Sequence, residues 1–510
     1  MQALPVFLIL AGFVVVLLSI AFLAGRQAPG AAGVKSTEDY VLGGRRIGTI
    51  VLLLSMGATY FSTWTLLGSF GAYYRSGVWF SGFAVWTIFH GAFIWLFGTR
   101  IWLAGKKFGF ITPGQMVEHY YSSTRLRVVV ALVGIAALVP VMLIQVSGGA
   151  RALESLTSGA VPYALGVTIS SLVVGGIVLW SGFKGTAWAD LFLGLFFASI
   201  MIFTAGYVLN LTGGLVLFEK VAELKPELIV NPGNPTRMLE LFLGLGFGAW
   251  ALPHMWQKFY SARSTDVLGK VAAATPFWNS WMMAIIPLIV GLAAIVPGVA
   301  PTVTTETSDT ILPQIFAEHA PIIAAIIVAG ILAAAISTIN SQLLSSASLV
   351  AEDIWGRLLK REMTDKESTR ITRIVVATLT VLVFALALTP GGAGHLVPVA
   401  ALGFGLGLQL VPSALGMLYF KSFTEAGAFA GIIAGTLSMI TIVVFGLDIG
   451  FGPGTSGFVV NLIVTIAVSA MTRKVSEETI EDYHGMFDRY MVNNVEEDVP
   501  ATAVPTGGKA

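Results

Sequence analysis

Apolar stretches of about 20 residues recur along the whole chain, and short polar segments separate them. Each stretch is long enough to cross a hydrocarbon core roughly 30 Å thick as an α-helix. Membrane-spanning strands would instead show shorter segments of alternating hydrophobicity, and these runs are continuous. The pattern therefore predicts an all-α polytopic membrane protein with about 13 transmembrane helices. The expected spans are 4–24, 48–74, 78–104, 128–150, 160–181, 186–210, 238–256, 271–297, 320–350, 371–389, 394–419, 425–446 and 452–472.

Composition agrees with this class and excludes several others. Hydrophobic residues make up 55% of the chain and charged residues 11%, whereas a soluble domain carries roughly 25% charged residues. The chain has no cysteine, which excludes disulfides, thiolate metal sites and cysteine nucleophiles. No basic tract suited to nucleic acid is present. We interpret the first span as a retained helix, because Arg26 follows its apolar run where a signal peptide would have a basic segment before it.

The distribution of Lys and Arg predicts the orientation of the chain in the cell membrane. Loops that carry an excess of Lys and Arg face the cytoplasm. With the N-terminus outside and the C-terminus in the cytoplasm, most of these residues fall in inner loops, and Lys258 is among them. The outer loops then hold Arg75, Arg151, Lys220, Lys225 and Arg237.

Two expected spans, the second and the seventh, are interrupted by small and polar residues. The first interruption lies in 54–64 and the second in 244–254, five spans further on. A matched pair of interrupted helices is typical of inverted-repeat transporters, whose binding sites lie at the breaks. The alternative is that Gly and Ser only allow close helix packing. The predicted regions are an N-terminal helix and inner loop, two five-helix repeats, two C-terminal helices and a disordered acidic cytoplasmic tail, over 1–47, 48–237, 238–419, 420–474 and 475–510.

The ninth span carries a cluster of hydroxyl side chains. Ser337 and Ser341 stand one turn apart on one helix face, and Thr338 lies beside them. Hydroxyls together with carbonyls freed by a broken helix can replace the water shell of a small hard cation. The alternative is that these hydroxyls bond only to their own i−4 carbonyls.

Asp190 is an acidic residue within an expected span, near its inner end. An intramembrane carboxylate suggests an ion ligand or a proton carrier. The alternative is an acid in the first turn of its helix, stabilised by the helix dipole. The sequence contains no His-Glu-x-x-His, Walker loop or Gly-x-Ser-x-Gly motif, so an enzyme is not expected.

Several longer segments resemble one family of transporters. They are Tyr40-Val-Leu-Gly-Gly-Arg-Arg46, Ala58-Thr-Tyr-Phe-Ser-Thr63, Gly148-Gly-Ala-Arg-Ala-Leu-Glu154, Leu252-Pro-His254 and Ser337-Thr-Ile-Asn-Ser-Gln-Leu-Leu344. In these segments the chain resembles the sodium:solute symporter family, which includes proline, pantothenate, sialic acid and sugar symporters. The motifs are most similar to pantothenate-type and monocarboxylate-type members. The chain departs from the usual pattern at Ser181-Gly182, where members usually have Gly-Gly.

The resemblance implies a LeuT-like core and a sodium site at the helix breaks. The ligands implied for the main sodium are the backbone carbonyls of Ala58, Phe61 and Ala334 and the hydroxyls of Ser337 and Thr338. Some family members have a second sodium site, and the matching positions in this chain are Asp190, Asn340 and Ser341.

The resemblance also implies where the substrate binds. It places the solute near Ser62, Thr63, Trp64, Trp250 and Gln409. Proline symporters carry an aspartate where this chain has Tyr60, which argues against a proline-type arrangement.

The function expected from the sequence is sodium-coupled import of a small organic solute, a monocarboxylate or a pantothenate-like acid, by alternating access. The expected partners are Na⁺, the solute and the lipid bilayer, with no nucleic acid, and the monomer is expected to be functional. Two alternatives remain open. One is a proton-coupled symporter of the same fold that uses Asp190, and the other is a non-transporting solute sensor.

Overall fold

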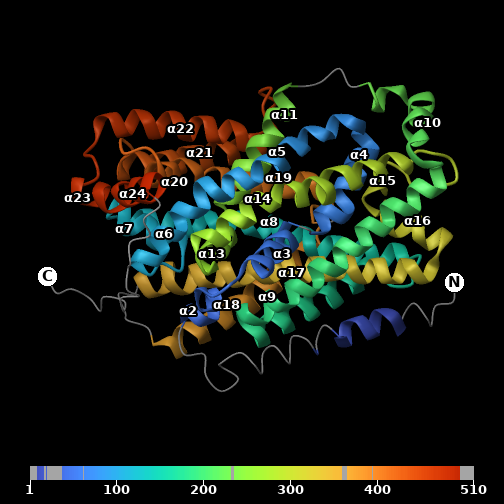
Figure 1. The fold of residues 1–510 in the computed structure, drawn as a ribbon, viewed down its shortest axis with the longest axis horizontal. Helices are drawn as coiled ribbons and strands as arrows, with labels where there is room; N and C mark the ends of the chain where they lie inside the picture. The colour runs from blue at the N-terminus through green and yellow to red at the C-terminus, as the bar shows by residue number, and fades with distance from the viewer. Residues whose placement is uncertain are drawn as a thin grey trace.

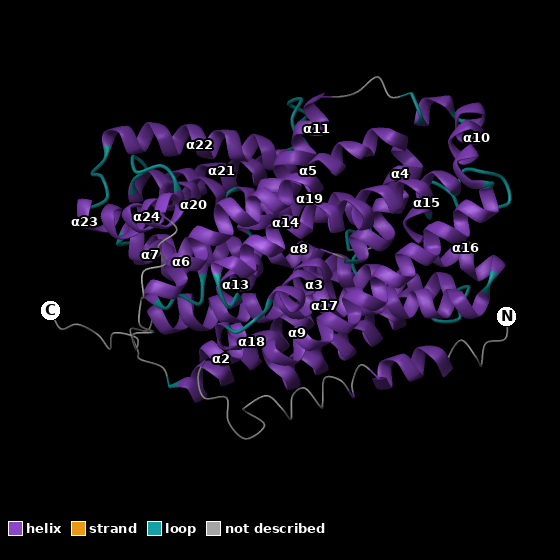
Figure 2. Ribbon diagram, in the orientation of Figure 1, coloured by secondary structure: helices purple, strands orange, loops and turns teal. Residues whose placement is uncertain are grey.

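The computed structural model describes residues 8–16, 19, 37–60, 62–230, 235–358, 364–392 and 394–493. The described regular structure is helical (Figure 2), apart from one isolated bridge between Ile47 and Ala262. The elements of the first half are α2 (Thr37–Leu42), α3 (Thr49–Tyr60), η2 (Trp64–Gly68), α4 (Ser69–Ser76), α5 (Gly82–Phe93), η4 (Ile94–Gly98), α6 (Thr99–Phe108), α7 (Pro113–Tyr121), α8 (Thr124–Leu156), α9 (Tyr163–Thr212) and α10 (Leu217–Leu224). Those of the second half are α11 (Pro235–Leu241), η7 (Phe242–Gly248), α12 (Ala249–Ala251), α13 (Pro253–Ser261), α14 (Thr265–Asn279), η8 (Ser280–Ile285), α15 (Ile286–Ala293), η9 (Ser308–Thr310), α16 (Ile311–His319), α17 (Pro321–Ser348), η10 (Leu349–Gly356), α18 (Asp365–Ala387), α19 (Leu396–Leu408), α20 (Val411–Leu418), α21 (Glu425–Phe445), α22 (Pro453–Met471), α23 (Glu477–Ile480), η11 (Glu481–Gly485) and α24 (Met486–Asn493).

Nine helices in the described part of the chain are long and apolar enough to cross a membrane. A tenth is the bent pair Met238–Ala251 and Pro253–Ser261, whose two parts meet at 55°. Three further expected spans are not among these ten. The first lies largely outside the described residues, the second is broken after α3, and the fifth corresponds to the apolar first part of α9, Tyr163–Gly176. The nine are Ile88–Phe108, Thr124–Leu156, Asp190–Thr212, Thr265–Ala293, Ile322–Gly356, Glu367–Ala387, Leu396–Leu418, Glu425–Phe445 and Pro453–Met471.

The long helical run α9 accounts for two of the expected spans. Near its start, the Tyr163 hydroxyl donates a hydrogen bond to the Ala387 carbonyl at the end of α18, at 3.0 Å. Near its end, Tyr207 packs against Phe316 of α16, with ring centroids 4.9 Å apart. Phe316 lies on α16, which directly follows η9 with Asp309, and Ala387 precedes His395, which lies 3.4 Å from Asp309. In the predicted orientation the end of the bundle that carries Asp309 is the outer end, and α10 and α16 are at the right in Figure 1. The two ends of α9 are therefore on the same side, so its 50 residues cross the bundle twice.

Helix α17 forms the centre of the bundle, whereas α21 and α22 lie at its edge. Of the apolar window in the span that contains α17, 83% is buried inside the protein, compared with 33% for α21 and for α22. Helices α8, α9 and α3 pack around α17, and α21 packs along α22. A lipid-facing helix keeps its apolar side chains exposed, whereas a central helix can hold polar groups only where other helices supply partners.

Both interrupted segments predicted from the sequence are broken in the structure. Pro253 starts α13, and Leu252 before it has an extended backbone with φ −64° and ψ 137°. This break follows from local chemistry, because a proline ring disfavours the helical conformation of the preceding residue. The first break follows α3, where the amide of Ser62 and the hydroxyl of Thr65 both donate to the Tyr60 carbonyl. The all-helical fold with two broken helices is confirmed.

The C-terminal segment differs from the disordered tail expected over 475–510. Residues 477–493 form α23, η11 and α24, which lie beside α7 at the end of the bundle opposite Asp309 (Figure 1). Tyr483 and Phe487 are fully buried, and the Tyr483 hydroxyl lies 3.0 Å from His119 Nδ1 of α7. Tyr483, Met486 and Phe487 share one helix face at i, i+3 and i+4, a short apolar stripe hidden in an acidic sequence. Residues 494–510 lie outside the described part of the chain.

The predicted orientation can be tested with fusion proteins. Thr304 is exposed in the loop before η9, and Lys474 is exposed after α22 at the opposite end. We expect a reporter that is active only in the cytoplasm to work after Lys474 and to fail after Thr304, because the positive loops lie at the Lys474 end. A periplasm-active reporter at both positions provides the control. Activity of the cytoplasmic reporter at Thr304 with none at Lys474 would invert the orientation.

Candidate transport site

A small cavity lies where the two broken helices face each other. Its volume available to water is about 40 Å³. Both breaks contribute to its wall, together with residues of α5, α8, η8, α17 and α19. The lining residues are Thr59, Tyr60, Ser62, Trp64, Trp86, Val141, Ile144, Ala249, Leu252, His254, Met283, Thr338, Gln342 and Phe404.

The wall of the cavity combines aromatic rings with neutral polar groups. The Tyr60 hydroxyl, His254 Nδ1 and Gln342 Oε1 are buried and have no hydrogen-bond partner among the described residues. A buried polar group without a partner costs about 1–3 kcal/mol, so such groups in a binding cavity usually serve a ligand. No aspartate, glutamate, lysine or arginine is among the lining residues that the structure describes.

The structure brings only some of the expected substrate residues to this cavity. Ser62 and Trp64 line it. Thr63 instead binds α8, since its hydroxyl donates to the Ile144 carbonyl at 2.7 Å and its amide donates to Gln145 Oε1 at 3.1 Å. Thr63 therefore joins the break to α8, and it is not among the residues that line the cavity.

Trp250 and Gln409 also lie outside the lining of the cavity. Trp250 stacks on Phe97, with ring centroids 4.1 Å apart and planes 4° from parallel. Gln409 Nε2 donates to the carbonyls of Gly405 and Gly454, at 3.0 and 3.1 Å. Both residues therefore hold helices together beside the site.

Tyr60, His254 and Gln342 are lining residues that the sequence analysis did not select. Two signals could have found them. Gln342 follows Thr338 by one turn on the same helix face, and Tyr60 and His254 adjoin the two breaks.

The predicted ligands of the main sodium that the structure describes lie on α3 and α17, which pack together. Thr338 Oγ1 lies 3.5 Å from the carbonyl of Thr59, next to Ala58. On α17, Ala334 lies one turn before Thr338, and Ser337 lies directly before it. Phe61 lies outside the described residues. Thr338 thus reaches the break of α3, and it also lines the cavity.

Asp190 makes its hydrogen bonds to three buried residues. It accepts from the Ser55 hydroxyl at 2.7 Å, from Lys258 Nζ at 3.2 Å and from the Ser337 hydroxyl. Asp190 and Lys258 are 0% and 1% exposed. The sequence analysis assigned Lys258 to an inner loop, whereas the structure places it inside the bundle.

Asn340 and Ser341, the other residues expected at a second sodium, are also buried. Asn340 Oδ1 and Ser341 Oγ have no hydrogen-bond partner among the described residues. The described hydrogen bonds of Asp190 go to Ser55, Ser337 and Lys258 and not to these two side chains.

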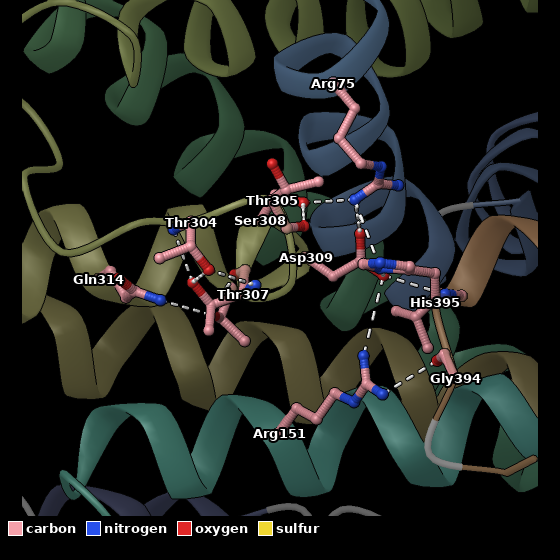
Figure 3. A network of polar contacts seen from close by, with 12 residues as sticks. Arg75, Arg151, Thr304, Thr305, Thr307, Ser308, Asp309, Gln314, Gly394 and His395 are labelled. Atoms are coloured by element: carbon pink, nitrogen blue, oxygen red, sulfur yellow. Dashed lines mark hydrogen bonds and ion pairs between the residues drawn. The ribbon is translucent and has the colours of Figure 1, made fainter. Parts of the chain in front are cut away.

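The outer end of the bundle is joined by an ionic network around Asp309 (Figure 3). Asp309 is 1% exposed, and its carboxylate lies 2.9 Å from Arg75 Nη1, 3.9 Å from Arg151 Nη1 and 3.4 Å from His395 Nδ1. Its Oδ2 also accepts the amide of Leu396 at the start of α19. Through η9 these contacts connect the outer ends of α4, α8 and α19. We call Arg75, Arg151, Asp309 and His395 the outer latch.

Comparison with known proteins places the chain in one family. Residues 40–435 match the sodium:solute symporter family. The osmoregulated proline transporter OpuE of Bacillus subtilis is 28% identical over 90% of this chain and 95% of its own length. The uncharacterized symporter YhjB of the same organism is 27% identical over 91% and 96%, and a sodium/proline symporter of Staphylococcus aureus is 26% identical over 92% and 93%. A particular similarity to pantothenate-type or monocarboxylate-type members is not confirmed, since the two relatives above with a named solute are proline transporters.

Solved structures agree on the fold. A Na⁺-coupled sialic acid symporter in a substrate-bound, outward-open state superimposes with a TM-score of 0.78, covering 93% of this chain and 99% of its own at 18% identity. The nucleobase-cation symporter Mhp1 superimposes with a TM-score of 0.55 at 14% identity, covering 87% and 98%. These likenesses show the architecture alone. The match over residues 40–435 establishes that the chain belongs to the sodium:solute symporter family and is a multi-pass, sodium-coupled membrane transporter, not an enzyme.

Proposed function

We propose that this protein imports a small, compact solute bearing a carboxylate, together with sodium, by alternating access. The observation that carries the proposal is the cavity between the two broken helices. Tyr60 and His254 supply polar groups there, and Trp64 and Trp86 supply apolar walls. The helical segment that begins at Trp64 has its positive dipole end at the cavity, a suitable place for a carboxylate.

The size of the cavity and the relatives narrow the solute class. About 40 Å³ of space holds only a few water molecules, so a compact solute fits better than an extended pantothenate-like acid. Two of the relatives named above are proline transporters, which makes proline the first candidate in spite of the difference at Tyr60. A short monocarboxylate is the second, because the described lining offers no carboxylate to pair with an ammonium group.

We propose that the main sodium binds beside the solute. Its ligands would be the hydroxyls of Ser337 and Thr338 with the carbonyls of Ala58, Phe61 and Ala334. Thr338 belongs both to this set and to the cavity wall. Bound sodium would therefore stabilise the solute site, and bound solute would stabilise the sodium site. A single chain supplies the described cavity wall, and we propose that the monomer is the transporting unit.

Uptake by proteoliposomes tests the solute class. We expect an inward sodium gradient to drive accumulation of labelled proline or of a short monocarboxylate such as lactate, and not of pantothenate. Choline replaces sodium in the control, and a pH gradient without sodium tests proton coupling. Accumulation of pantothenate alone would contradict the compact-solute proposal, and accumulation driven by the pH gradient alone would contradict the sodium site.

The Tyr60 hydroxyl can be tested in the same assay. Tyr60→Phe removes one oxygen and keeps the ring that packs on Trp86 and His90. A hydrogen bond to a charged solute contributes about 1.5–3 kcal/mol, so we expect KM to rise roughly tenfold or more. Tyr74→Phe, at the outer end of α4, is the matched control and should leave KM unchanged. An unchanged KM in Tyr60→Phe would remove this hydroxyl from the binding site.

A further inference from the structure

Lys258 is a cation held inside the transport machinery. It lies on α13, the helix that follows the second break, and its side chain is 1% exposed. Its ammonium group lies 3.2 Å from Asp190 Oδ2 and also donates to the Ser55 hydroxyl. Lys258 therefore connects the second broken helix to α9 and to the first broken helix, α3.

The oxygen atoms around this ammonium group are of the kind that bind sodium. Ser55 supplies a hydroxyl and Asp190 a carboxylate, whose other oxygen accepts the hydroxyl of Ser337. An ammonium group is a compact point charge on a flexible stem and carries the same charge as Na⁺. A buried carboxylate needs a cationic partner, and a single positive charge neutralises it. Lys258 and a second sodium would therefore compete for Asp190.

We propose that Lys258 is a tethered cation that occupies the position of a second sodium at Asp190. The ammonium group fills this position in the conformation described, and sodium reaches Asp190 only when the ammonium group withdraws. The inference deepens the proposed sodium sites, because Asp190, Asn340 and Ser341 would bind a second ion only after that exchange.

The pair also positions a proposed ligand of the main sodium. The Ser337 hydroxyl donates a hydrogen bond to Asp190, which leaves the lone pairs of the hydroxyl oxygen available to a cation. Lys258 holds Asp190 in place, so it orients Ser337 without binding the main sodium itself. Lys258 and Ser55 belong to the two different broken helices. A movement of one broken helix relative to the other would therefore change the contact between them.

Equilibrium binding of ²²Na⁺ to the purified full-length protein tests the proposal. Lys258→Met removes the charge and keeps much of the volume, so we expect it to bind about one more sodium ion per protein than the parent. Lys258→Arg retains a cation and should keep the parent stoichiometry. The double variant Lys258→Met with Asp190→Asn removes both charges and should also return to the parent stoichiometry.

Thermal unfolding supplies the second measurement, because Lys258→Met leaves Asp190 buried without its partner. We expect sodium chloride to stabilise Lys258→Met more than choline chloride of equal ionic strength does, and by a larger margin than in the parent. A folded Lys258→Met with the parent stoichiometry would overturn the proposal. Equal instability of this variant in both salts would overturn it as well.

The number of sodium ions bound by the parent protein separates a failure of this inference from a failure of the proposed function. A parent protein that binds no sodium would argue against the Ser337 site. The tethered-cation inference depends instead on the difference in binding between the parent and Lys258→Met.

Discussion

Replacing Ser337 with alanine is expected to raise the sodium concentration for half-maximal uptake by roughly 10- to 100-fold. The proposed sodium would lose one ligand oxygen, and a hydrogen bond or ligand contact to a charged group contributes about 1.5–3 kcal/mol. Asp190 would also lose one of its three described donors. Thr338→Ala should act in the same direction. Initial rates of uptake against sodium concentration measure the effect, and substrate affinity should change little at saturating sodium.

Ser348→Ala is the matched control for this experiment. Ser348 is a buried serine on the same helix, and its hydroxyl donates to the Leu344 carbonyl at 2.8 Å, one turn back. It represents the alternative reading, in which a membrane-helix hydroxyl only bonds its own backbone. We expect its sodium dependence to equal that of the parent. Parent-like sodium dependence in both Ser337→Ala and Thr338→Ala would exclude these two hydroxyls from the sodium site.

Replacing Asp309 with alanine is expected to lower the free energy of unfolding by about 3–5 kcal/mol, because one partner of a buried ion pair is lost. Arg75 and Arg151 would remain close together, at 18% and 16% exposure, without the carboxylate between them. The start of α19 would also lose the acceptor of the Leu396 amide. We expect a lower midpoint of thermal unfolding in purified protein and slower uptake, since the outer latch connects α4, α8 and α19.

Two variants make the Asp309 result specific. Asp309→Asn keeps the shape of the side chain and removes its charge, so it should show much of the same destabilisation. Asp448→Asn removes an exposed carboxylate from the loop between α21 and α22 and should leave the midpoint unchanged. A parent-like midpoint for both Asp309 variants would show that the latch does not stabilise the bundle.

The sequence by itself determined the class of fold and the position of the helix breaks. Apolar runs predict membrane helices because the bilayer requires every backbone group to find a partner within its own segment. Pro253 predicts the second break because the proline ring acts on the residue next to it. The neighbouring hydroxyls of Ser337 and Thr338 on one helix were likewise visible in a short motif. All of these depend on neighbours in the chain.

Only the tertiary structure decided which polar side chains face the cavity. Thr63 was expected near the substrate, and in the structure it binds Gln145, 82 residues away along the chain. Lys258 was assigned to an inner loop, but it meets Asp190, 68 residues away, inside the bundle. The buried face of 477–493 depends likewise on α7, which supplies the partner of Tyr483. A helix and its breaks follow from local backbone chemistry and from the length of an apolar run. The partner of a buried charge or hydroxyl depends on which distant helix packs against it, and a single sequence does not contain that information.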